Sequence, residues 1–106
     1  MTVLRIYRKG SDYIGFECSG HSGYGEAGSD IVCAAVSTAV QFCIHCGETI
    51  DEAPLQLSID EDAAIIRCMS RAPNPQFSKH IAILAALGKS IATEYAMYFN
   101  LEFMEV

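Results

Sequence analysis

The sequence has few cations and no long apolar run. It contains seven Lys and Arg residues and thirteen Asp and Glu residues, which gives a net charge of −6. Proteins that bind nucleic-acid phosphates need clustered Lys and Arg, so we expect no direct nucleic-acid partner, whereas a basic peptide or protein fits this charge. No stretch approaches 18 apolar residues, and residues 1–9 lack a signal-peptide core. We therefore expect a cytoplasmic protein without a membrane partner.

Internal repeats, low-complexity segments and linkers are also missing. With 106 residues, of which 51% are hydrophobic, the chain is expected to form a single domain over residues 1–106. Its core is expected to be large enough to be stable without disulfide bonds or a structural metal ion. The five cysteines are odd in number, and no secretion signal is evident. We expect them to stay reduced rather than to pair as disulfides.

Apolar periodicity predicts the order ββαββαβ. Period-two patterns indicate strands at 2–8, 13–18, 55–59, 64–69 and 99–103, and helical spacing indicates helices at 30–46 and 75–95. Gly47 is expected to end the first helix, and Asn74 with Pro75 to begin the second. The sequence therefore predicts an α+β two-layer sandwich, with a mixed, mainly antiparallel five-stranded sheet and both helices on one face. The uncovered sheet face is expected to be partly apolar, which favours a homodimer.

The two helices are expected to bury one apolar stripe each. These stripes are Val32, Ala35, Val36, Ala39, Val40 and Cys43 in the first helix, and Phe77, Ile81, Leu84, Gly88, Ile91 and Tyr95 in the second, widened by Ile83 and Leu87.

A glycine-rich loop leads directly into the first helix, and this junction carries the candidate chemistry. Residues 20–23 read GHSG, and residues 30–37 read DIVCAAVS. Ser29 or Asp30 is a suitable N-cap, which places Cys33 near the first turn, where the helix dipole and the free N–H groups favour a thiolate. His21 lies on a loop that can fold back over this helix end. A thiolate with an imidazole in reach is the minimum apparatus of a cysteine nucleophile.

Three further residues are supporting candidates. Gly20 anchors His21 at a strand end. Asp30 either caps the helix or orients His21 or substrate. Ser37, one turn after Cys33, either donates to the thiolate or bonds the carbonyl four residues back.

The remaining cysteines indicate core filling rather than chemistry. Cys18, Cys43 and Cys68 lie on apolar stripes, where a thiol behaves as a small hydrophobic group. The pair Cys43 and Cys46 sits at the C-terminal end of its helix, where the dipole opposes thiolate formation, and no second pair of ligands is available for zinc. His80 has no evident partner. We therefore expect no metal site and no cofactor.

The GHSG and DIVCAAVS motifs, with the element order around them, resemble the bacterial ribosomal-processing cysteine proteases over essentially the whole chain. The resemblance implies a small homodimeric α/β sandwich with a mobile loop between two catalytic residues, His21 and Cys33. It also implies an endopeptidase that removes a short N-terminal extension from a large-subunit ribosomal protein precursor, after paired aromatic residues. Two alternatives stay open: a non-catalytic peptide-binding ribosome-assembly factor, and a thiol-dependent hydrolase of small esters or amides.

Overall fold

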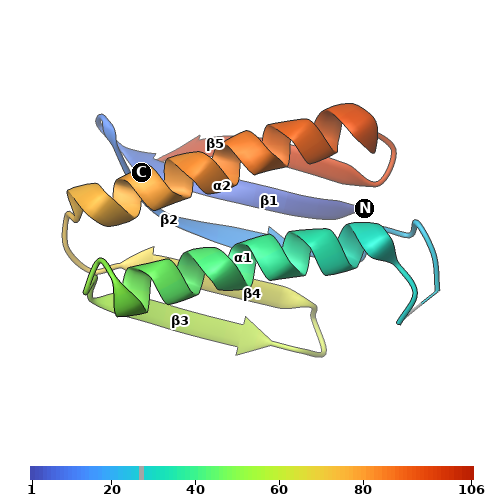
Figure 1. Ribbon diagram of the computed structural model, residues 1–106, viewed down its shortest axis with the longest axis horizontal. Helices are drawn as coiled ribbons and strands as arrows, with labels where there is room; N and C mark the ends of the chain where they lie inside the picture. The colour runs from blue at the N-terminus through green and yellow to red at the C-terminus, as the bar shows by residue number, and fades with distance from the viewer. Residues whose placement is uncertain (27) are drawn as a thin grey trace.

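Five strands pair into one sheet, and both helices cover the same face of it (Figure 1). The computed structural model describes residues 1–26 and 28–106. Its elements are β1 (Thr2–Lys9), β2 (Asp12–Ser19), α1 (Ile31–Thr49), β3 (Leu55–Asp60), β4 (Ile65–Ser70), α2 (Pro75–Glu94) and β5 (Phe99–Glu105). The predicted element order and two-layer α+β architecture are confirmed.

The sheet is mixed, because its last strand joins it in parallel. The strand order is β3-β4-β2-β1-β5, and every neighbouring pair is antiparallel except β1 with β5. Leu4 of β1 lies opposite Cys18 of β2 on one side and opposite Leu101 of β5 on the other. The loop that carries His21 therefore leaves from the end of a central strand.

The core lies between the sheet and one stripe of each helix. Of the stripe predicted for α1, Val32, Val36, Val40 and Cys43 are buried, whereas Ala35 is exposed. In α2, Phe77, Ile81, Leu84 and Gly88 are buried as predicted. Ile83 and Leu87, which were expected to widen that stripe, are instead 59% and 48% exposed, because they lie on the outer side of the helix layer.

Gly47 does not end the first helix, which continues to Thr49 and is capped by Ile50. Gly47 is buried inside the last turns, where a Cβ atom would lie 2.8 Å from Cε1 of Phe77 and 3.0 Å from Cδ1 of Leu55. The glycine is thus explained by the close approach of α1 to its neighbours rather than by a left-handed cap.

By length and composition alone, α1 is long and apolar enough to cross a membrane. The expectation that no segment approaches the length of a membrane span was therefore wrong. The core helix of a soluble protein passes the same test. Here α1 packs Val36, Val40 and Cys43 into the core.

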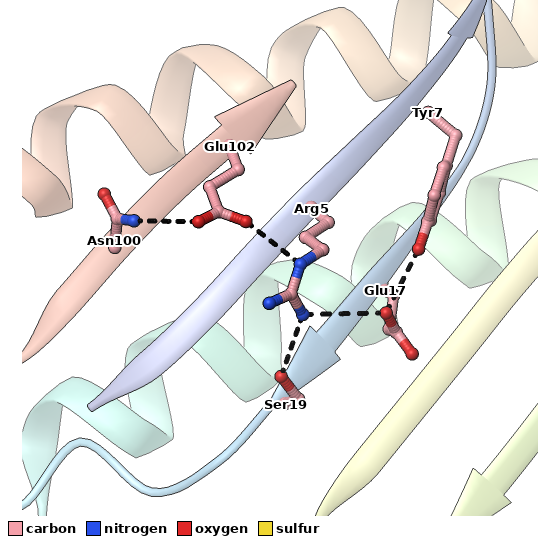
Figure 2. Close-up of polar contacts among 6 residues, drawn as sticks. All are labelled: Arg5, Tyr7, Glu17, Ser19, Asn100 and Glu102. Atoms are coloured by element: carbon pink, nitrogen blue, oxygen red, sulfur yellow. Dashed lines mark hydrogen bonds and ion pairs between the residues drawn. The ribbon is translucent and has the colours of Figure 1, made fainter. Parts of the chain in front are cut away.

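The open face of the sheet carries a polar network at its centre (Figure 2), and the register places the apolar side chains of Val3, Tyr7, Ile65, Met69 and Met104 on the same face. Arg5 lies at its centre, with Nε 3.0 Å from Glu102 Oε2 and Nη1 3.7 Å from Glu17 Oε2. The Tyr7 hydroxyl donates to Glu17 at 3.1 Å, and Arg5 also donates to the Ser19 hydroxyl. This face is therefore partly apolar, as the sequence predicts, and the homodimer stays a prediction.

Candidate active site

Cys33 occupies the third position of α1, and Asp30 is the N-cap. One oxygen of the Asp30 carboxylate accepts hydrogen bonds from the backbone nitrogens of Val32 and Cys33, both at 3.0 Å. The capping role predicted for Asp30 is therefore confirmed, and Ser29 is not the cap. The positive end of the helix dipole lies at this first turn and favours a negatively charged sulfur at Cys33, whereas the Asp30 carboxylate acts in the opposite direction.

The loop before α1 folds back over the thiol, as expected from its glycines. The backbone nitrogen of Ser22 donates to Cys33 Sγ at 3.4 Å. Gly20 begins this return with φ +86, and a Cβ atom there would lie 2.5 Å from the Met1 carbonyl oxygen. Its nitrogen donates to the Ala64 carbonyl at 3.0 Å. Gly20 thus anchors the start of the loop, because only glycine fits both the conformation and the space.

His21 and Cys33 line the same hollow, which has a volume of about 560 Å³. His21 is exposed and Cys33 is partly buried. Among residues 1–26 and 28–106, no hydrogen bond joins the His21 ring to the thiol, whose hydrogen bond comes from the Ser22 nitrogen. The predicted mobile segment at 23–28 includes residue 27, which lies outside the described residues.

A second hollow, of about 430 Å³, opens on the other side of Cys33. Apolar side chains of α1, β3 and β4 form much of its wall, and Asp60 and Glu61 stand at the β3–β4 turn. Cys33 and Ser37 line both hollows, so the thiol lies at their junction. The Ser37 hydroxyl accepts a hydrogen bond from Gln41 Nε2 at 3.0 Å, and neither bond considered for it from sequence is present within the described residues.

The other thiols are held in the protonated form. Burial raises the pKa of Cys43 to about 12, and that of Cys68 to about 11. Burial, aided by the nearby Cys33 and Glu17, raises the pKa of Cys18 to about 11. The pKa of Cys46 is raised as well, by burial and then by the charge of Asp51. All five cysteines are free.

Three features of the structure were missed by the sequence analysis. Ser22 is buried and hydrogen-bonded to Cys33. The sequence signal for it is a serine followed by glycine, which is typical of a turn, and in the structure its hydroxyl accepts from the Tyr24 nitrogen. Cys18 packs against the core, as predicted, but it also lines the second hollow with Cys33, which was not predicted. His80 does have a partner, because its Nδ1 lies 2.7 Å from the buried Asp51 carboxylate.

Asp51, His80 and the pair Cys43 and Cys46 lie near one another at the far end of α1. Within residues 1–26 and 28–106, no group of three His, Cys, Asp or Glu side chains is arranged to hold a metal ion.

Comparisons with known proteins agree with this geometry. The family described as cysteine protease Prp matches residues 1–100. Prp from S. aureus, an essential ribosomal processing protease crystallised with a covalently linked product peptide, superposes with a TM-score of 0.90 at 19% identity, covering 98% of this chain and 100% of the other. SMU.848 from Streptococcus mutans superposes with a TM-score of 0.85 at 22% identity, covering 100% and 96%. These likenesses establish the fold. No curated protein sequence matches the chain significantly.

Proposed function

Because the chain belongs to the Prp family of cysteine proteases, we propose that it removes a short N-terminal extension from a large-subunit ribosomal protein precursor. In this proposal Cys33 is the nucleophile and His21 is the general base and acid. The observation that carries it is the position of Cys33 Sγ, which lies in the first turn of α1, receives the Ser22 N–H, and shares a hollow with His21.

The reaction needs few groups. His21 takes the thiol proton, or pairs with a thiolate already formed, and Cys33 Sγ attacks the carbonyl carbon of the scissile bond. The carbon–nitrogen bond then breaks, His21 protonates the leaving amine, and water hydrolyses the thioester. The N–H groups of Val32 and Cys33 are already bonded to Asp30. The Ser22 N–H, which points at Sγ, is in this proposal a donor to the developing oxyanion.

The two hollows suit the two halves of a peptide. Since His21 must reach the leaving nitrogen, the leaving segment belongs in the hollow that His21 lines. The acyl segment then enters the apolar hollow, whose walls fit large apolar side chains. Asp60 and Glu61 at that hollow and the net charge of −6 favour a peptide from a basic protein.

The relatives support the choice of substrate. The S. aureus Prp structures are described as a ribosomal processing protease with a product peptide and with a substrate peptide. Membership in a protease family favours an enzyme over the non-catalytic assembly factor considered from sequence. Such a substrate agrees with action in the cytoplasm, where ribosomes assemble.

The decisive experiment is incubation with a ribosomal protein precursor that carries its N-terminal extension, followed by mass spectrometry. We expect one cut that releases the extension. Cys33→Ala and His21→Ala should each abolish this cut with little change in melting temperature, because neither side chain belongs to the buried core. Cys43→Ala is the matched control: it should keep activity while losing about 1 kcal/mol or more of stability, as expected for a buried side chain. An inactive Cys43 variant beside an active Cys33 variant would contradict the assignment.

We also propose that the protein is a homodimer that associates through its helix layer. Phe42, Ile83 and Leu87 are 70%, 59% and 48% exposed, and Phe42 and Leu87 line a shallow hollow between the helices. An exposed apolar surface of this kind marks a protein interface. Leu87→Glu should shift the protein to a monomer in analytical ultracentrifugation, whereas Met97→Glu, at another exposed position, should not.

A further inference from the structure

Ser22 is buried beside the nucleophile and bonds to the site through both its backbone and its side chain. Only 3% of the residue is exposed. Its nitrogen donates to Cys33 Sγ at 3.4 Å, and its hydroxyl donates to Asp30 Oδ2 at 2.5 Å. A short hydroxyl-to-carboxylate contact is a charge-assisted bond, which is stronger than a bond between neutral groups.

Asp30 joins this loop to the turn that carries the nucleophile. Its Oδ1 accepts from the first turn of α1, including the Cys33 nitrogen at 3.0 Å. Its Oδ2 accepts from the Ser22 hydroxyl and from the nitrogens of Tyr24 and Gly25 at 3.2 and 3.3 Å. One carboxylate therefore fixes the spacing between the Ser22 amide and the Cys33 sulfur.

The neighbouring backbone makes this fixation necessary. Gly20 and Gly23 flank the segment, and both have positive φ, at +86 and +75. The bond from its nitrogen to Ala64 anchors Gly20, whereas Gly23 can rotate away from such an angle at little cost, so the peptide between them needs a restraint on its Gly23 side. The Ser22 hydroxyl supplies it, because it is the side-chain group of this segment that bonds to Asp30.

We propose that Ser22 is a positioning residue, whose hydroxyl, held by Asp30, aims its own backbone N–H at the Cys33 sulfur. This inference rests on the proposed function, since it concerns the same thiol. An aimed N–H stabilises negative charge on the thiolate and then on the oxyanion, and it costs no reorganisation during the reaction. Ser22 thus acts through its amide and not as a proton carrier.

Alkylation of Cys33 tests the inference without a peptide substrate. In Ser22→Ala we expect the rate of Cys33 alkylation by iodoacetamide at pH 6.5 to fall about three- to tenfold, the effect expected when one hydrogen bond to a charged group is weakened. With a cleavable peptide, kcat should fall while KM stays unchanged. Ser29→Ala is the matched control: it removes a hydroxyl that bonds the Glu26 carbonyl in the same loop, and it should alkylate at the wild-type rate.

A double-mutant cycle separates positioning from a general loss of structure. In an Asp30→Asn background, Ser22→Ala should have little further effect on alkylation, whereas independent roles would give multiplied effects. Ser22→Thr, which keeps the hydroxyl, should restore most of the rate. If Ser22→Ala fails to fold, the inference is tested on the wild-type protein by the NMR chemical shift of the Ser22 amide proton. This chemical shift should change when Cys33 is alkylated.

The inference would be overturned if Cys33 in Ser22→Ala were alkylated at the wild-type rate, or if alkylation left the chemical shift of the Ser22 amide proton unchanged. A protein that shows these alkylation effects but cuts no ribosomal precursor would refute only the proposed substrate.

Discussion

The Asp30 carboxylate lies 3.0 Å from the backbone nitrogen of Cys33, so the residue that begins the helix also holds the turn of the candidate nucleophile. The hydrogen bond from Ser22, followed by the one from the Cys33 nitrogen, lowers the pKa of Asp30 to about 2. A carboxylate whose pKa is lower in the folded than in the unfolded chain stabilises the fold only while it is ionised.

This shift predicts a stability that depends on pH in the acid range. The contribution of Asp30 should be fully present above the unfolded pKa of about 3.9 and be lost as the pH falls through about 2. Asn is also a good N-cap but does not titrate. The difference in melting temperature between wild type and Asp30→Asn should therefore shrink between pH 4 and pH 2. A constant difference in melting temperature across this range would show that folding does not lower the pKa of Asp30.

The five thiols should differ strongly in reactivity. A limiting dose of iodoacetamide near pH 6.5 should label Cys33 first and inactivate the enzyme in parallel, because the raised pKa values of Cys18, Cys43 and Cys68 keep those thiols protonated. Peptide mapping measures the order. A substrate peptide should protect Cys33, and His21→Ala should slow its labelling. Labelling of Cys46 first, with activity intact, would show that the start of α1 does not activate a thiol.

Gly47 and Gly88 should respond differently to the same substitution. Ala is the better helix former, by about 1 kcal/mol. At Gly47, however, the new methyl group would lie 2.8 Å from the fully buried Phe77 ring, so we expect Gly47→Ala to lower the free energy of unfolding by about 1–3 kcal/mol. At Gly88 the nearest atom is 3.2 Å away, at the end of the half-buried Leu101, so Gly88→Ala should be close to neutral. Urea denaturation measures both, and equal effects would contradict this packing.

Removal of metal ions should change nothing. No group of three suitable side chains is arranged for a metal ion within residues 1–26 and 28–106, and a structural zinc site needs four ligands. Protein dialysed against a chelator should keep its activity and melting temperature. Stoichiometric zinc in the purified protein, with activity lost on its removal, would instead identify Cys43 and Cys46 as ligands.

Local chemistry made much of the fold predictable. Asn74 with Pro75 marks the start of α2 because a side-chain cap and a residue without an N–H both suit a first turn. The same reasoning offered Ser29 or Asp30 as the cap of α1, of which the structure uses Asp30, and so placed Cys33 near the first turn. Strand positions followed from period-two alternation, and their observed bounds differ from the predicted ones by no more than two residues.

Other features depend on contacts that the sequence does not reveal. Gly47 satisfies the pattern of a helix end, but the ring of Phe77, thirty residues away, decides its role. Ile83 and Leu87 have helical spacing suited to a core, yet the sheet lies on the other side of α2. The amide of Ser22 meets the thiol only because Asp30 folds the loop back, and a backbone donor leaves no trace in a residue pattern.

The parallel pairing of β1 with β5 sets the order in which the chain can fold. Thr2 lies opposite Phe99 and Arg8 opposite Glu105, although these partners are far apart in sequence. During synthesis β1 can pair with β2 as soon as both have emerged, but its other edge stays bare until residues 99–105 leave the ribosome. Such non-local pairing is slow, and an open strand edge attracts other chains. Completion of the sheet is therefore a late event, and truncation of β5 should yield a chain prone to aggregate rather than a smaller active enzyme.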